Sequence, residues 1–143
     1  TSSAPIFSMD NTRKTDDRPC PCGSGRVFSA CCGPFLSGRK HAPTPEKLMR
    51  SRFSAYYLGG HGQYLLQTWW PPMAEKLSQE QLDRRDQAWS HLEILAKSQH
   101  GDDGMVEFRA WYQDDNREMQ ALHERSVFKR LKQRWLYVGG EIY

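Results

Sequence analysis

The chain has 143 residues, of which 38% are hydrophobic and 12% aromatic, and its net charge at pH 7 is +3. This composition excludes general disorder, and the length suits one domain with an appendage. Charge or glycine interrupts the hydrophobic runs, so neither a signal peptide nor membrane insertion is predicted, and we expect a cytoplasmic protein. The mild positive charge is typical of an ordinary solvated surface, and direct nucleic-acid binding is not expected.

Three segments precede the main domain. Residues 1–18 are rich in Ser, Asp, Lys and Arg and bury too little surface to offset the entropy cost of ordering, so a flexible leader is predicted. Residues 19–36 hold all the cysteines and are predicted to form a small knuckle. Residues 37–43 combine Ser, Gly, Pro and basic side chains, which is typical of a linker. The main domain is then residues 44–143.

The four cysteines form one Cys-x-Cys pair and, after eight further residues, one Cys-Cys pair. A disulfide within either pair would close a strained small ring, whereas the Gly-Ser-Gly turn allows the second pair to fold over the first. Four thiolates make the closed tetrahedral shell of a structural zinc site. We therefore favour zinc over cross-paired disulfides or free thiols, with iron as the alternative metal because it accepts the same ligands. The candidate ligands are Cys20, Cys22, Cys31 and Cys32.

A helix is predicted to open the main domain. Thr44 offers a capping hydroxyl, Pro45 suits the first helical position, and Glu46 lies near the positive end of the helix dipole. The helix is predicted to end at about Leu58, before the Gly59-Gly60 pair.

Arg52 falls near the middle of the apolar stripe of this helix. A guanidinium that faces a core needs an anionic or multiply accepting partner. Alternatively, its stem is buried and its head reaches the rim. The helix alone leaves both interpretations open. Arg50 lies on the opposite face and is predicted to be solvated.

Two short helices are predicted to follow. The first covers residues 61–70, points Tyr64, Leu65 and Trp69 inward, and is ended by the Pro71-Pro72 pair. The second covers residues 78–87 and starts with a Ser-x-x-Gln capping box.

From about residue 89 the hydrophobic period changes to two, which indicates strands. Four strands with short connections favour an antiparallel meander, and helices followed by strands indicate an α+β fold. The apolar faces predicted for the four strands are Leu92, Ile94 and Ala96; Val106, Phe108, Ala110 and Tyr112; Leu122 and Phe128; and, on a short fourth strand, Leu136 and Val138.

Two polar residues of the third strand share the predicted inward face. If Leu122 and Phe128 pack on the helices, Glu124 and Ser126 also point inward. Glu124 is then the candidate partner for Arg52, in a buried pair that specifies how the helix docks on the sheet. A polar group inside a concave sheet also suits a ligand anchor, so the same residues are candidates for a cavity site.

The stretch Cys20-Pro21-Cys22-Gly23-Ser24-Gly25, with Cys31-Cys32-Gly33, resembles the SEC-C motif, named for the metal-binding tail of the translocation motor SecA. Cys32 stands where many such motifs have histidine. The run from Ala42 to Tyr56 and the segment from Leu122 to Phe128 resemble the bacterial YchJ family. This resemblance implies an N-terminal metal knuckle followed by a nuclear transport factor 2-like (cystatin-like) cone of helices packed on a curved antiparallel sheet.

The resemblance to the YchJ family implies no particular activity, but SEC-C motifs elsewhere are small metal-dependent binding surfaces. Carried over, it implies a recognition role for Arg26 beside the cysteines and a protein or ribonucleoprotein partner, such as one associated with the ribosome. The alternative is small-molecule binding or catalysis in the cone cavity. Because Glu124 is the one inward acid that we identify and no histidine accompanies it, we favour binding over an enzyme.

Overall fold

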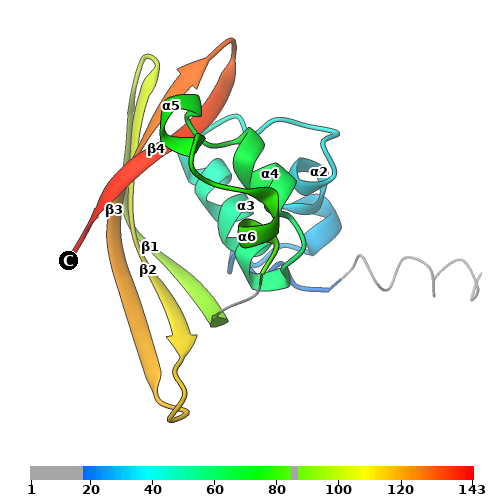
Figure 1. Cartoon of the computed structure of the whole chain (residues 1–143), viewed down its shortest axis with the longest axis vertical. Coiled ribbons are helices and arrows are strands. Elements are labelled where there is room, and N and C mark those ends of the chain that lie inside the picture. The colour runs from blue at the N-terminus through cyan, green and yellow to red at the C-terminus, as the bar shows by residue number, and fades with distance from the viewer. Residues whose placement is uncertain (1–17, 85–86) are drawn as a thin grey trace, which may run out of the picture.

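The computed structural model describes residues 18–84 and 87–143. Helices cover one face of a four-stranded antiparallel sheet (Figure 1), in which neighbouring strands follow one another in the chain as the predicted meander. The predicted leader lies outside the described residues, except for Arg18. The strands are β1 (Ala88–His100), β2 (Asp103–Gln113), β3 (Met119–Leu131) and β4 (Arg134–Ile142).

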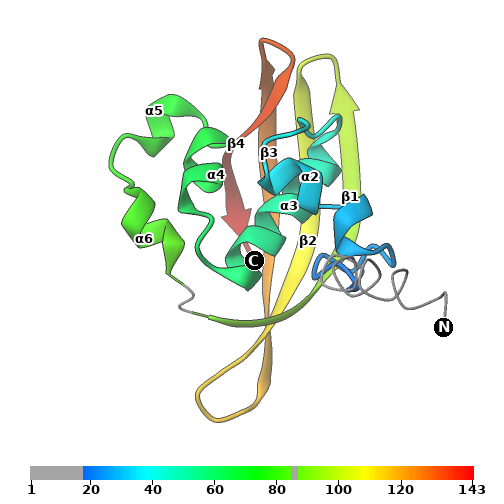
Figure 2. The same cartoon turned by 90° about the vertical axis from the view of Figure 1, so that its right-hand side faces the viewer.

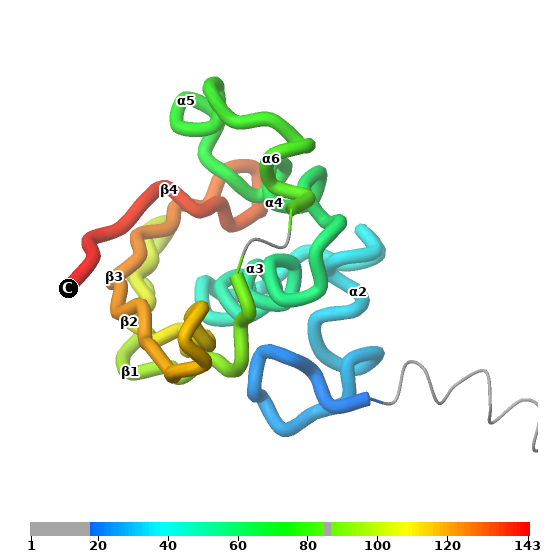
Figure 3. The backbone as a smooth tube through the Cα atoms, turned by 60° about the horizontal axis from the view of Figure 1, so that its bottom comes forward, coloured from blue at the N-terminus to red at the C-terminus, as the bar shows by residue number. Residues whose placement is uncertain are grey.

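One long helix lies in the hollow of the curved sheet (Figure 3), and the other helical segments are short. The cysteine segment and the later short helices flank the long helix on opposite sides (Figure 2). Within the described ranges, no helix has the length and apolar character needed to cross a membrane. The helical segments are the 3-10 turn η1 (Phe28–Ala30), α2 (Gly33–Leu36), α3 (Pro45–Leu58), α4 (Gly62–Gln67), α5 (Pro71–Ala74) and α6 (Gln79–Asp83).

The long helix α3 begins and ends where the sequence predicts. The Thr44 side chain accepts a hydrogen bond from the Lys47 backbone N–H at 3.2 Å, and Gly59 leaves the helix with a φ of 74°, which favours glycine. The apolar stripe packs on the sheet in one core with Val106, Phe108 and Phe128. Burial of this stripe fixes α3 against β1 and β2.

The short helices differ in extent from the prediction. Pro71 and Pro72 begin α5 instead of only ending the preceding helix, because proline suits the first turn, where its missing N–H is not needed. The capping box at Ser78 is confirmed, but α6 ends at Asp83, short of the predicted residue 87.

Two further errors concern which side chains of β1 and β4 face the helices. A register shift between Ile94 and Ala96 exposes Ala96 and places Lys97 opposite the buried Val106. On β4, the short turn that pairs Leu131 with Arg134 places Tyr137 opposite the buried Phe128, and the shift in the pairing of β3 with β4 comes only after Tyr137. Trp135 and Tyr137 therefore pack in the core under the helices. Of the predicted pair, Leu136 is buried outside that core and Val138 is half-buried, and β4 is longer than predicted.

Glu46 in the first turn of α3 links the helix to the sheet. It accepts hydrogen bonds from Lys97 of β1 and from Arg50 one turn later. The hydrogen bond from Lys97, together with that from Arg50, lowers the pKa of Glu46 below its usual value of about 4.5. A lowered carboxyl pKa stabilises the fold above the unfolded-state pKa, and this stabilisation is lost as the pH falls through the folded-state pKa.

We expect Glu46→Gln to lower the free energy of unfolding by about 1 kcal/mol at neutral pH, because it removes both charged hydrogen bonds and a favourable dipole charge. Urea denaturation at neutral pH and at about pH 2 checks this, since the difference between the two proteins should vanish once Glu46 itself is protonated. An equal loss at both pH values would contradict a charge-based role.

Candidate metal centre

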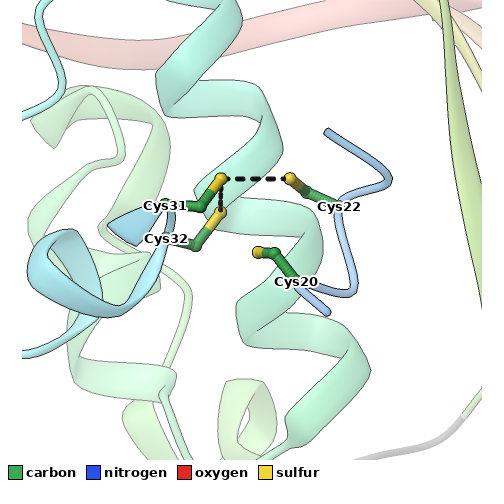
Figure 4. Close-up of side chains that lie close together, drawn as sticks. All are labelled: Cys20, Cys22, Cys31 and Cys32. Carbon is green, nitrogen blue, oxygen red and sulfur yellow. Dashed lines mark hydrogen bonds between the residues drawn. The ribbon is translucent and has the colours of Figure 1, made fainter. Parts of the chain in front are cut away.

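The four cysteine sulfurs gather at one point beside α3 (Figure 4). Their Sγ atoms all lie within 4.8 Å of one another. Cys20 and Cys22 precede the glycine turn, and Cys31 and Cys32 follow η1, so the two pairs approach from opposite ends of the knuckle. All four are free thiols. The structure therefore brings the whole predicted ligand set together in one cluster without a disulfide among these cysteines.

The knuckle backbone forms a tight hairpin that brings the two cysteine pairs together. The backbone N–H of Cys20 donates to the Arg26 carbonyl at 2.9 Å, and that of Phe28 donates to the Arg18 carbonyl at 2.7 Å. Gly23 and Gly25 at the turn have φ of 78° and 86°, a region that favours glycine. A Cβ on Gly23 would also lie only 3.2 Å from the Leu92 carbonyl oxygen, so the turn packs closely on β1.

The sulfur spacing fits a tetrahedral thiolate site. Sγ of Cys31 lies 3.6 Å from that of Cys22 and 3.9 Å from that of Cys32. Four sulfurs about 2.3 Å from one central metal would be separated by about 3.8 Å. The residues present therefore suit one metal ion held by four thiolates. Such a shell accepts zinc or iron, and its geometry does not choose between them.

Burial and mutual hydrogen bonding set the protonation of the cluster. Cys20, Cys22 and Cys32 are buried, and Cys31 is partly exposed. Hydrogen bonds with Cys20 and Cys32 lower the pKa of Cys22, whereas hydrogen bonds with Cys20 and Cys22 raise the pKa of Cys32. Burial raises the pKa of Cys31 to about 11. The raised pKa values of Cys31 and Cys32 favour their protonated forms, so a bound cation must displace these protons before both sulfurs can ligate it.

A polar stripe of α3 holds the knuckle in place. Arg50 Nη1 donates to the Cys22 carbonyl oxygen at 2.8 Å, and the Cys20 sulfur lies 3.6 Å from the Ser54 hydroxyl. The prediction that Arg50 is solvated was wrong, because its side chain is mostly buried between Glu46 and the knuckle. The spacing of Glu46, Arg50 and Ser54, each four residues apart, was the sequence signal for this second face of the helix.

A cationic groove of about 460 Å³ lies beside the sulfurs and is lined by Cys31 and Cys32. Arg26, the predicted recognition residue, lies in this groove with Lys40 and Lys47. All three are exposed, and none forms an ion pair with any residue that the structure describes. The sequence did not predict the groove, because its cations come from the knuckle, the predicted linker and α3.

Arg52 and Glu124 are both buried, with 2% and 8% of their surfaces exposed, and both line a cavity between α3 and the sheet. The direct bond predicted between them is not formed anywhere in the described structure. Arg52 Nη1 donates instead to the Leu65 carbonyl oxygen at 2.9 Å and to Thr68 Oγ1 at 2.7 Å. Backbone acceptors of α4 thus take the place of the predicted carboxylate, which the sequence pattern of α3 and β3 did not indicate.

Two further residues complete this buried network. Ser126 is fully buried, as predicted, and its hydroxyl donates to Glu124 Oε2, which also accepts from the Tyr137 hydroxyl at 2.8 Å. The Tyr137 ring lies 4.7 Å from the Arg52 guanidinium carbon, so it touches both charged groups. Tyr137 was missed because the sequence Trp135-Leu136-Tyr137-Val138 is apolar on both faces of the strand, so alternation alone does not show which face is inward.

Comparison with protein-family models finds two matches along the chain. Residues 19–34 match the SEC-C motif, and residues 44–140 match the model described as YchJ, middle NTF2-like domain. The chain belongs to the YchJ family. These matches confirm the predicted order of a SEC-C knuckle followed by an NTF2-like α+β domain, and the four clustered cysteines are able to bind a metal.

Relatives and solved structures agree with this assignment. UPF0225 proteins of Sodalis glossinidius and Serratia proteamaculans are 39% and 42% identical to the chain, over 85% of it and over 82% and 81% of their own lengths. The solution structure of a SEC-C motif containing protein from Rhodopseudomonas palustris matches with a TM-score of 0.80 at 34% identity, covering 87% of this chain and 98% of that one. A crystal structure of a SEC-C motif containing protein from Psychrobacter arcticus has the same fold, with a TM-score of 0.77 at 24% identity over 90% of this chain and 84% of that one.

Proposed function

We propose that the chain is a zinc-binding docking protein, whose cysteine knuckle shapes a cationic groove for a protein partner or for the protein component of a ribonucleoprotein. The observation that carries this proposal is the position of the four-sulfur cluster, which forms part of the groove wall beside Arg26, Lys40 and Lys47. A metal held there would fix the knuckle, and the knuckle in turn places Arg26.

The metal has a structural role in this proposal. Four protein ligands leave no open coordination position for water or substrate, so the ion contributes folding energy and shape. Zinc fits because it has no redox chemistry of its own and favours the four-thiolate shell. A cytoplasmic location suits the site, since thiols stay reduced there and free to ligate.

The groove suits acidic side chains of a protein better than nucleic-acid bases. Its exposed cations have no anionic partner in the described structure, so an incoming carboxylate gains charge-assisted hydrogen bonds. Sequence-tolerant binding of single-stranded nucleic acid uses exposed aromatic platforms. The groove lining contains the half-buried ring of Phe35 and the imidazole of His41, but no tyrosine or tryptophan.

Affinity capture from a bacterial lysate tests the proposal with three zinc-loaded baits. These are the wild type, a groove variant carrying Lys40→Glu and Lys47→Glu, and the matched control Lys76→Glu, which changes an exposed lysine that does not line the groove. We expect the wild type and the control to capture the same proteins in a salt-sensitive manner and the groove variant to lose them. Equal capture by all three baits would overturn the proposal.

Cys31→Ser serves as a fourth bait and tests the contribution of the metal. If the metal shapes the groove, this variant loses the same partners as the charge-reversed variant. Retention of the partners by a bait without metal would mean that the cations act independently of the knuckle.

A further inference from the structure

The cavity under α3 combines an aromatic wall with two buried charged residues. Its volume is about 170 Å³, and its lining is mainly apolar. An apolar cavity of about 150 Å³ is large enough to bind benzene. The space therefore suits a ligand of roughly one six-membered ring with one small substituent. The aromatic residues that line it include Phe53, Tyr56, Trp69, Trp89, Phe108 and Tyr137.

Arg52 brings a positive charge into this cavity, and the carboxylate of Glu124, which lines the same cavity, does not form an ion pair with it. Arg52 is 2% exposed, and none of the ion pairs among the described residues includes it. Its guanidinium carbon lies 4.6 Å from the Trp69 ring and 4.7 Å from the Tyr137 ring. Burial lowers the pKa of Arg52, and the nearby hydroxyl of Tyr56 opposes that shift. Buried charges are normally paired, so this guanidinium is an unusual group to leave with rings and neutral acceptors alone.

The hydrogen bonds of Arg52 leave part of its guanidinium for another partner. Both bonds of ordinary geometry leave from Nη1, to Leu65 and Thr68. The Tyr56 side chain also interacts with this guanidinium. Within the described structure, no other hydrogen bond of ordinary geometry leaves from Nε or Nη2. These two nitrogens form the edge of a guanidinium that binds a carboxylate through two parallel bonds.

Glu124 already has hydrogen-bond donors on one of its two carboxylate oxygens. Its Oε2 atom accepts from both Ser126 and Tyr137, so its charge is partly compensated by neutral donors. Because Glu124 already accepts two hydrogen bonds, Arg52 is the charged group of the cavity that we expect to take a further charged partner, and its complementary ligand is an anion.

We propose that this cavity binds a small aromatic monocarboxylate of about the size of benzoate, with its carboxylate on the free edge of Arg52 and its ring between the aromatic side chains. Apolar walls with a few convergent polar groups are the usual composition of a small-molecule site. The proposal concerns binding alone, since no histidine stands among the described lining residues to share acid-base work with Glu124. It is independent of the docking role of the knuckle, because the cavity and the cationic groove share no lining residue.

Titration of the full chain with three probes of similar shape tests the charge requirement. The probes are benzoate, benzyl alcohol and benzylamine, observed by amide chemical-shift changes in two-dimensional NMR spectra. We expect saturable shifts from benzoate that map to α3, α4 and the inner face of the sheet, and affinity at least about tenfold weaker for the two other probes, which lack a charge-assisted bidentate contact. Equal binding of all three, preference for benzylamine, or no saturable binding of benzoate would overturn the proposal.

Three variants locate the carboxylate in the cavity. Arg52→Met is expected to weaken benzoate binding at least about tenfold while it leaves benzyl alcohol binding unchanged. If this variant does not fold, Glu124→Gln supplies the test, because removal of the negative charge should strengthen benzoate binding. Glu118→Gln, at an exposed position away from the cavity, is the matched control and should leave the affinity unchanged. Unchanged benzoate affinity in both cavity variants would place the bound probe elsewhere.

Discussion

Replacement of Cys22 by serine is expected to abolish stoichiometric metal binding and to unfold the knuckle. Cys22 is fully buried, and its sulfur lies within 4.8 Å of the three other cysteine sulfurs. Apparent binding free energies of structural zinc are on the order of 10 kcal/mol at neutral pH, and much of this is folding free energy. The loss of one ligand should therefore cost the knuckle more than any loss of packing around the sulfur.

Elemental analysis and NMR together check this expectation. The wild type should carry one metal ion per chain, and Cys22→Ser should carry much less than one. The amide signals of the knuckle should collapse to unfolded positions, whereas those of the sheet should stay dispersed. Ser54→Ala is the matched control, because it removes the hydroxyl beside Cys20 but keeps all four sulfurs. Full metal content in Cys22→Ser, or an unchanged knuckle spectrum, would contradict a four-ligand site.

Arg52→Ala is expected to be the most destabilising single substitution in the main domain that we describe, at about 3 to 5 kcal/mol. It would empty the space of a fully buried side chain and leave the Leu65 carbonyl oxygen and the Thr68 hydroxyl without their charged donor. It would also remove two cation–π contacts. The substitution also removes the free-energy cost of keeping the guanidinium charge out of water, but we expect this gain to offset only part of these losses.

Comparison of Arg52→Ala with Arg52→Met separates shape from charge. Methionine fills much of the same volume, so its cost reports mainly the lost hydrogen bonds and ring contacts, and we expect it to be smaller. Urea denaturation supplies both values. Arg39→Ala, at an exposed position, should change stability by less than about 0.5 kcal/mol. A cost of Arg52→Ala below about 1 kcal/mol would show that the buried guanidinium is not needed for helix docking.

Local signals were enough to predict the elements that the chain forms with its own neighbours. Thr44 and Pro45 marked the start of α3, and the alternation of Val106 and Phe108 marked an inward strand face. The cysteine spacing predicted the four-sulfur cluster for the same reason, since a short turn brings the two cysteine pairs together. Each of these features depends on residues that are close in the sequence.

Features that join distant segments were not predicted. Lys97 faces the helices because of a shift in the pairing of β1 with β2, and a shift of one residue reverses the direction of every later side chain. Tyr137 faces them because the turn before β4 places it opposite Phe128. The predicted partner of Arg52, Glu124, was wrong for a related reason. The sequence showed which face of α3 would be buried, but only the placement of α4 decides which oxygen atoms reach that guanidinium.

Two arginines two residues apart in α3 are held on different sides of the helix. Arg50 donates a hydrogen bond to the Cys22 carbonyl oxygen of the knuckle, and Arg52 donates one to the Leu65 carbonyl oxygen of α4. Because successive residues are about 100° apart around the axis, the two side chains lie on nearly opposite sides of the helix, and a rotation of the helix about its axis would disturb both contacts. The two contacts together fix the rotation of α3 about its own axis, so the knuckle on one side and α4 on the other both set the orientation of the helix that covers the cavity.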